Sequence, residues 1–437
     1  MNNKKPRFLV LGGGISGLTA AKALQEKERD YLLLERCPSL GGLTRTVEVG
    51  DFCFDYTGHF LHLCRYETPA DIPCAGLRNE EWQQVNRKSF CYVAGKMITA
   101  PIQYNLRELP AECLSTCMQS YEARPGLPQS GNPTFRDYII SGFGQYLADI
   151  FLIPQNEKTM ATSLDRLSIK AVKRFFPSPD EKLVRAGMRT DSQIPEQYNS
   201  RFWYPKTGGI GLLVQGLSNG LNNTSVNQEV VAIDCSKRTL STRGGDRFPW
   251  DILLPSLPLK ELCLAINDQE LISAASALTH SATISFNIGI RGPLAPNLQD
   301  AHWVYVSDHS IPFYRVGFYS NIGHGTCAVG YSSMYVEVGV PGEDIEKIDI
   351  VHDLQPKVLK ALEDLGWLRS QDVVCTAIHV MGCAYVHHTP EREQIMDFIL
   401  SRLDKCGIFP IGRYGLWDYT SMEDSIESAL SAVSRFG

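Results

Sequence analysis

The chain has 437 residues, and 42 lysines and arginines against 48 aspartates and glutamates give it a formal charge of −6 at pH 7. Apolar residues make up 43% and charged residues 21%, a composition that indicates a folded globular protein and excludes disordered, collagen-like and coiled-coil chains. The slightly acidic balance argues against a phosphate-backbone partner, so we expect no nucleic acid to bind.

Thirteen cysteines are scattered along the chain, without a CxxC pair or a Cys/His cluster at zinc spacing. We therefore expect free thiols, no metal site and a cytoplasmic protein. The apolar run 138–153 is interrupted by Gln145 and Asp149 and ends at Pro154. It is shorter than the roughly 20 residues of a membrane span, which predicts no transmembrane segment.

The first elements alternate between strand and helix. Residues 7–11 form an apolar run that predicts a buried parallel strand, and the Ala- and Leu-rich segment that follows predicts a helix through Leu24. Residues 31–34 predict a second strand that ends in Glu35. Farther along, amphipathic segments between about 110 and 173, including 134–152 and 164–173, predict a mainly helical insertion.

The second half of the chain is richer in strand-like runs. These runs are 230–234, 252–254, 282–290, 303–306, 313–318, 326–331, 373–380 and 407–412, with helices near 349–365 and from about Met422. Together the elements predict an α/β protein whose Rossmann-type FAD-binding domain is discontinuous, made of 1–75, 200–260 and 373–437. A mainly helical insertion, 105–190, and a mixed β-sheet substrate domain, 76–104 and 261–372, are expected to complete the fold.

The pattern Gly12-x-Gly14-x-x-Gly17 lies between the first predicted strand and helix, and Glu35 ends the next strand. The first glycine permits a tight turn, the second lets backbone N–H groups approach a pyrophosphate, and the third allows the helix to pack closely on the strand. The helix N-terminus favours the phosphate charge, and the Glu35 carboxylate can accept hydrogen bonds from ribose hydroxyls. This combination predicts a bound dinucleotide.

A second glycine pair, Gly41-Gly42, lies in the segment 36–45 just beyond Glu35. It resembles the corresponding segment of the amine-oxidase and protoporphyrinogen-oxidase flavoprotein superfamily. This resemblance implies that the dinucleotide is FAD and that it lies along this segment. Residues 227–234 and 250–255 resemble the later strands of the same FAD domain.

Within that superfamily, several patches resemble the UDP-galactopyranose mutases, and they occur in order along nearly the whole chain. These patches are Gly58-His59-Phe60-Leu61-His62, the Pro-x-Gln-x-Asn segment 101–105, the Phe-x-x-Pro-x-Asn-x-Lys segment 151–158, Phe313-Tyr314-Arg315, and the C-terminal segment 412–419. The resemblance implies that the first lies at the flavin, the second and third bind uridine, and the last two face a diphosphate.

The resemblance assigns three sets of site residues. The catalytic set is His59, Arg315 and Arg413. The cofactor-binding set is Gly12, Gly14, Ile15, Ser16, Gly17, Glu35, Arg36, Gly42, Leu43, Thr44, Gly58, His59, Val230, Gly412, Arg413, Tyr419, Met422 and Ser425. The substrate-binding set is Gln103, Phe151, Asn156, Arg174, Tyr314, Arg315 and Tyr419. A guanidinium is a planar fork that matches phosphate bidentately, so Arg315 and Arg413 are suited to hold a diphosphate.

The resemblance implies an enzyme in which reduced flavin isomerises a nucleotide sugar, a small-molecule substrate such as a UDP-sugar, without net redox change. The expected uracil-pocket residues differ, however, because Gln155, Met160 and Ala100 stand where Tyr, Trp and Tyr are expected. An FAD-dependent oxidase or dehydrogenase acting on another substrate is therefore the alternative, and a flavin-free nucleotide-binding protein is a third possibility. Association into a homo-oligomer is left open.

Overall fold

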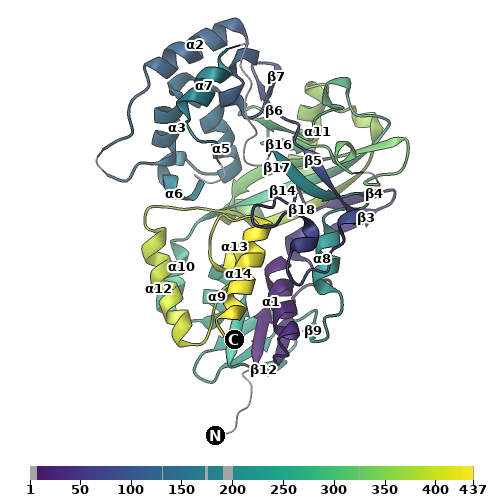
Figure 1. The fold of residues 1–437 in the computed structure, drawn as a ribbon, viewed down its shortest axis with the longest axis vertical. Coiled ribbons are helices and arrows are strands. Elements are labelled where there is room, and N and C mark those ends of the chain that lie inside the picture. The colour runs from purple at the N-terminus through teal and green to yellow at the C-terminus, as the bar shows by residue number, and fades with distance from the viewer. Residues whose placement is uncertain (1–6, 130, 173–175, 190–199, 324, 437) are drawn as a thin grey trace.

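The computed structural model describes residues 7–129, 131–172, 176–189, 200–323 and 325–436 (Figure 1). A parallel sheet with the strand order β13-β1-β2-β9 lies in the part of the molecule where the two chain termini are found (Figure 1). Its central strands are continuous apolar runs because helices and loops bury both faces. The strands are β1 (Phe8–Leu11), β2 (Tyr31–Leu34), β9 (Thr224–Ser225) and β13 (Ile252–Pro255).

The C-terminal helix α14 (Met422–Ser434) packs on α1 (Ile15–Glu26), so the two ends of the chain lie side by side in this part of the molecule (Figure 1). A small antiparallel sheet and further helices surround the parallel sheet. These elements are β10 (Val230–Asp234), β11 (Thr239–Thr242), β12 (Arg247–Pro249), α8 (Gly211–Ser218), α9 (Leu259–Ile266), α10 (Gln269–Ser276), α12 (Arg392–Lys405) and α13 (Gly412–Gly415).

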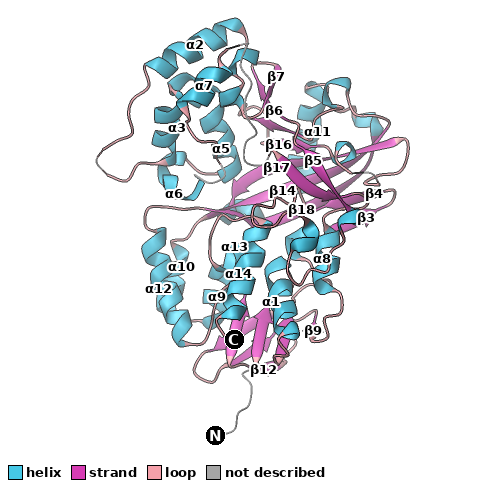
Figure 2. Ribbon diagram, in the orientation of Figure 1, coloured by secondary structure: helices cyan, strands magenta, loops and turns pink. Residues whose placement is uncertain are grey.

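A seven-stranded mixed sheet crosses the middle of the molecule, with the strand order β18-β14-β17-β16-β15-β6-β7 (Figure 2). One of its faces is apolar and is covered by α11 (Gln355–Asp364), and the polar face of the central strands β14 and β17 is buried as well. The strands are β6 (Ser89–Val93), β7 (Lys96–Thr99), β14 (His280–Arg291), β15 (Trp303–Val306), β16 (Arg315–Gly317), β17 (Tyr331–Pro341) and β18 (Val373–Val386).

The helical insertion forms its own hydrophobic cluster beside this sheet. Its helices are α2 (Ala111–Glu122), α3 (Phe135–Phe143), α4 (Gln145–Leu147), α5 (Ile153–Met160), α6 (Ile169–Val172) and α7 (Glu181–Gly187). Two strand pairs complete the fold, β3 (Thr46–Val49) with β4 (Phe52–Asp55) and β5 (Trp82–Asn86) with β8 (Arg201–Pro205).

The α/β class, the Rossmann-type unit and the mixed sheet agree with the sequence prediction. Three local expectations were wrong. The run 134–152 is not one helix, because Gly144 adopts a φ of 82° and separates α3 from α4. Residues 326–330 form a loop before β17, and 407–412 contributes only one bridge, between Ile408 and Leu253.

The division into domains stays a prediction, although β18, which we grouped with the dinucleotide-binding segments, is hydrogen bonded along β14 in the seven-stranded sheet. All thirteen cysteines are free. No helix in the described ranges combines the length and the apolar character needed to span a bilayer.

Candidate functional site

The glycine-rich turn after β1 has the geometry that the sequence predicted. Gly12 adopts a φ of 96°, and a Cβ on Gly17 would overlap the carbonyl oxygen of Gly12, so close helix packing requires a glycine there. A Cβ on Gly14 would instead be in ordinary van der Waals contact with the Cα of Gly42, at 3.9 Å. The backbones of Gly14 and Gly42 approach each other closely, because a Cβ on Gly42 would be only 3.1 Å from the Cα of Gly14.

Glu35 is buried at the end of β2, and backbone N–H groups already bind its carboxylate. Gly13 N donates to Oε2 at 2.6 Å and Cys37 N donates to Oε1 at 2.7 Å. Glu35 therefore holds the glycine turn in place as well as keeping lone pairs for a ribose. Arg36 is exposed and pairs with Glu261 at 3.3 Å, so the structure directs this guanidinium to the surface.

The C-terminal segment closes over the same turn. Gly412 has a φ of 72°, and a Cβ there would overlap the side chain of Ser16 in the first turn of α1. Helix α14 begins with a capping box in which Ser421 and Asp424 bind each other's backbone N–H groups. Met422 and Ser425 lie in its first turn, and their contact with the cofactor stays a prediction.

The seven-stranded sheet turns a polar face toward this region. Its strand register places five residues in one row, because cross-strand neighbours share a face of the sheet. The row runs Tyr305, Arg315, Glu337, Ser285 and His379 across β15, β16, β17, β14 and β18. The sheet therefore brings Arg315 to the side that faces the dinucleotide-binding part of the chain.

Arg315 does not offer a free fork. Its Nε donates to Glu337 Oε2 at 2.5 Å and its Nη2 donates to Glu337 Oε1 at 2.8 Å, while Glu337 is only 1% exposed. Burial alone would lower the pKa of Arg315, but the Glu337 carboxylate outweighs it and holds that pKa well above its ordinary value. We expected Arg315 to bind phosphate with both arms of its guanidinium, and the structure corrects this expectation. The guanidinium binds Glu337 in that way, and only its remaining N–H groups can face a ligand.

Arg413 approaches the site from the C-terminal segment. Its Nη1 donates to Thr420 O and its Nη2 to Ala384 O, both at 2.8 Å, whereas its buried Nε has no acceptor among the described residues. The guanidinium carbon lies 4.6 Å from the ring centre of Tyr419 and 5.5 Å from that of Tyr385. These rings enclose a cation that has no carboxylate partner in the described part of the chain.

His59 lies within the electrostatic reach of both arginines. Burial of the imidazole lowers the pKa of His59 to about 3, and the positive charges of Arg315 and Arg413 act in the same direction. The ring is therefore neutral at pH 7 and carries one donor and one acceptor nitrogen. Its loop is held from both ends, because Asn287 donates to the carbonyl oxygen of Asp55 and buried Glu423 accepts from the backbone of residues 64–66.

Buried polar atoms without partners gather in this region. Within the described residues, the atoms without a hydrogen bond include His59 Nδ1, Arg413 Nε, Tyr335 Oη, Ser285 Oγ and His379 Nε2. Buried polar groups normally have partners, so these five atoms are candidates for contacts to a bound molecule. Together with the glycine-rich turn, these atoms fit a dinucleotide cofactor and an anionic ligand beside it.

Most of the predicted uridine residues have structural partners instead. Phe151 is packed in the core of the helical insertion, and Asn156 Nδ2 donates to Leu152 O one turn earlier in its own helix. Gln103 and Tyr314 are buried, and Gln155 donates to the Tyr314 carbonyl at 3.2 Å. Arg174 lies outside the described residues. Val230, Leu43 and Thr44, which belong to the predicted cofactor set, have no hydrogen bond to Arg315 or Arg413 within the described residues.

Sequence reasoning missed Glu337, Tyr335 and Tyr385. Glu337 lies in β17, which we had placed too early in the chain, so its register opposite Arg315 was not visible. An acidic residue in an otherwise apolar strand was the available signal, because a buried carboxylate needs a cationic partner. Tyr335 is fully buried, with its ring between Gly58 and Gly317.

Replacing Gly58 by alanine is expected to disturb this site directly. The added Cβ would overlap the buried ring of Tyr335, and overpacking of this kind costs about 1–3 kcal/mol. We expect a lower apparent unfolding temperature and weaker cofactor retention. Gly244→Ala is the matched control, because its nearest neighbour is the Thr242 hydroxyl at 3.8 Å. Equal unfolding temperatures for both variants would contradict the packing described.

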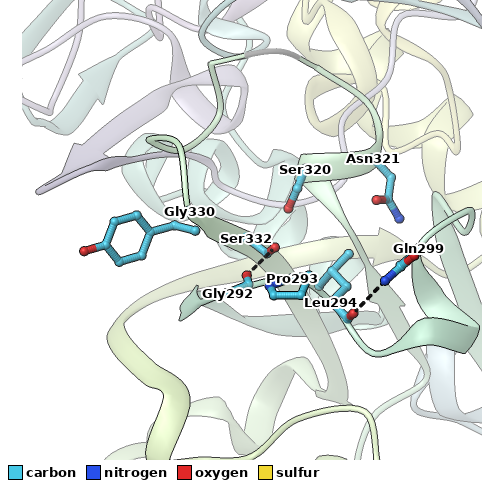
Figure 3. A pocket seen from close by; sticks show the side chains of 9 residues that line it. Gly292, Pro293, Leu294, Gln299, Ser320, Asn321, Gly330 and Ser332 are labelled. Atoms are coloured by element: carbon cyan, nitrogen blue, oxygen red, sulfur yellow. Dashed lines mark hydrogen bonds between the residues drawn. The ribbon is translucent and has the colours of Figure 1, made fainter.

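A separate surface depression of about 520 Å³ lies at the far end of β14 and β17 (Figure 3). It is formed mainly by turns, with Ser332 donating to Gly292 O and Gln299 donating to Leu294 O. Ser320 and Asn321 also line this depression. Because it contains no charged side chain, we place the candidate site at the polar face of the sheet and not here.

The comparisons with known proteins agree with this arrangement. A family model described as an NAD(P)-binding Rossmann-like domain matches residues 10–70. Coproporphyrinogen III oxidase of Mycobacterium tuberculosis strain H37Rv is 24% identical over 297 residues, which are 62% of this chain and 65% of that oxidase. The chain thus spans slightly less than two thirds of that oxidase's length. Cyclohexylamine oxidase from Brevibacterium oxydans IH-35A superposes with a TM-score of 0.68 and 13% identity over 99% of both chains.

These findings define the chain as having the fold of the amine-oxidase and protoporphyrinogen-oxidase superfamily, with a Rossmann-like dinucleotide-binding unit at its start. Within that fold, it is similar to a reduced UDP-galactopyranose mutase, with a TM-score of 0.89 and 23% identity over 99% of this chain and 94% of that one. The recognised resemblance is therefore confirmed at the level of the fold. The matched family model supports a bound dinucleotide at the glycine-rich turn.

Proposed function

We propose that the chain is an FAD-dependent enzyme that acts on an anionic small molecule, and that this molecule is a nucleotide sugar. The observation that carries the proposal is that two partly buried arginines, Arg315 and Arg413, both act electrostatically on His59 beside the polar face of the sheet. A second support is the fold similarity to a UDP-galactopyranose mutase. Bound FAD would supply a flavin that, once reduced, can act on the sugar without being consumed.

The residues of the chain divide the work around this flavin. The Gly12–Gly17 turn and the N-terminus of α1 would receive the pyrophosphate, because backbone N–H groups and the helix dipole favour anions there. His59 would meet the flavin as a neutral hydrogen-bonding group, given its lowered pKa. Arg413 and the outer N–H groups of Arg315 would orient the anionic leaving group and stabilise its developing charge.

If this proposal holds, turnover needs reduced flavin but uses no stoichiometric reductant. Anaerobic enzyme reduced with dithionite should convert a UDP-sugar into an isomer that chromatography resolves, while the oxidised enzyme does not. His59→Gln keeps the size and hydrogen-bonding capacity of a neutral side chain and serves as the comparison for the role of the imidazole. Absence of any isomer from a panel of UDP-sugars, with full flavin content, would exclude the mutase function.

A second candidate is an FAD-dependent oxidase or dehydrogenase. The match to a coproporphyrinogen III oxidase and the altered uridine residues Gln155 and Met160 favour it. The site is also compatible with a carboxylate, since a guanidinium binds carboxylates and phosphates alike. Formation of one peroxide per substrate in air, without any sugar isomer, would select this alternative.

A further inference from the structure

The strongest ion pair of the site lies between two of its own residues. Both oxygens of Glu337 contact Arg315, at 2.5 and 2.8 Å, and Glu337 is 1% exposed against 16% for the Arg315 side chain. A bidentate, buried pair of this kind is held tightly, because each group would be costly to bury alone. At the distance of a ligand, the opposite charges of such a pair largely cancel.

Arg413 has a different electrostatic environment. Its two terminal nitrogens donate to backbone carbonyls, which carry no charge, and its Nε has no acceptor. The groups around it are Tyr385, Tyr414 and Tyr419, whose neutral rings lie 4.6–5.7 Å from its guanidinium carbon. The positive charge of Arg413 is therefore not neutralised by the described residues.

We propose that Arg315 and Glu337 act as one neutral unit, and that Arg413 alone supplies the net charge that attracts the anionic ligand. Glu337 is then a specificity-determining residue: it limits the affinity for highly charged anions and fixes the direction in which Arg315 presents its remaining N–H groups. This inference rests on the proposed function only in taking the ligand to be an anion. It differs from a clamp made by two free arginines, in which Arg315 itself would carry ligand charge.

The decisive experiment compares three variants by calorimetric titration of the FAD-loaded protein with UDP. Glu337→Gln removes the negative charge and is expected to tighten UDP binding by about 10- to 100-fold, the effect of one unit charge at about 6–8 Å in a medium of intermediate dielectric constant. Arg315→Gln leaves a buried carboxylate and should weaken UDP binding by roughly 10- to 150-fold. The double variant Arg315→Gln/Glu337→Gln removes both charges and should bind UDP more tightly than Arg315→Gln, and less tightly than the wild type only by the hydrogen bonds that Arg315 donates.

The matched control is Glu122→Gln, which breaks the similar but exposed pair between Arg185 and Glu122 in the helical insertion. It should leave UDP binding unchanged. Should Glu337→Gln bind UDP no more tightly than the wild type, or should the double variant bind UDP as weakly as Arg315→Gln, the neutral-unit inference is wrong. If Glu337→Gln does not fold, the double variant alone decides between the two arrangements.

Failure of the proposed function gives a different result. If wild-type protein binds no UDP, the nucleotide-sugar proposal fails, and the inference is then judged from the midpoint potential of the bound flavin without any ligand. Reduced flavin gains negative charge, so Glu337→Gln should raise this potential and the double variant should leave it near the wild-type value. Equal potentials in Glu337→Gln and wild type would overturn the inference independently of UDP.

Discussion

Gly14→Val is expected to abolish FAD binding while the protein remains folded. A Cβ at this position would be 3.9 Å from the Cα of Gly42, an ordinary van der Waals contact, so the first added carbon meets no clash. The valine side chain would instead fill the space in which the backbone must approach a pyrophosphate. Absorbance of the purified protein and of the supernatant after denaturation measures the FAD content.

Two further variants make this result interpretable. Gly126→Val is the control for a valine in open space, because a Cβ at Gly126 would have no tertiary neighbour within 4 Å among the described residues. This variant should retain FAD fully. Gly17→Ala should unfold the dinucleotide-binding part itself, since its Cβ would overlap the carbonyl oxygen of Gly12. A folded Gly14→Val variant that keeps stoichiometric FAD would remove the basis of the cofactor assignment.

Loss of Arg315 is expected to have the second large effect. Arg315→Ala removes charge-assisted hydrogen bonds, which should lower UDP affinity by roughly 10- to 150-fold, or about 1.5–3 kcal/mol. The structure adds a second reason, because the variant leaves Glu337 buried without its partner, at a cost of about 3–5 kcal/mol in stability. Arg315→Lys keeps the charge but not the fork, so it should restore binding only in part.

Arg413→Ala should weaken UDP binding as well. It should also disturb the flavin, because the preceding residue, Gly412, packs against Ser16 in the first turn of α1. Titration of UDP against flavin fluorescence, with FAD content measured in parallel, separates the two effects. Unchanged UDP affinity in Arg315→Ala, or a wild type that binds UDP no better than uridine, would show that no diphosphate site exists here.

The sequence by itself determined the elements whose interactions are local. The alternation of an apolar run, three glycines, a helix and a second apolar run predicted β1, α1 and β2 to within one or two residues at each end. The start of α14 at Met422 was predicted equally well, and it is fixed locally, because Ser421 and Asp424 are close in sequence and each binds the backbone N–H of the other. Glycine positions carried information for the same reason: a tight turn and a close helix approach are set by residues a few positions apart.

Only the tertiary structure decided which charges meet. Arg315 and Glu337 are 22 residues apart, and they face each other because β16 and β17 pair in one particular register. A shift of one residue would turn one of them to the apolar face under α11, and no local pattern specifies that register. The same holds for the Tyr335 ring between Gly58 and Gly317, and for Arg413, whose tyrosine neighbours come from β18 and the C-terminal segment. The turn that receives the cofactor could therefore be predicted from sequence, whereas the charge of the site beside it depends on contacts between strands that only the folded sheet brings together.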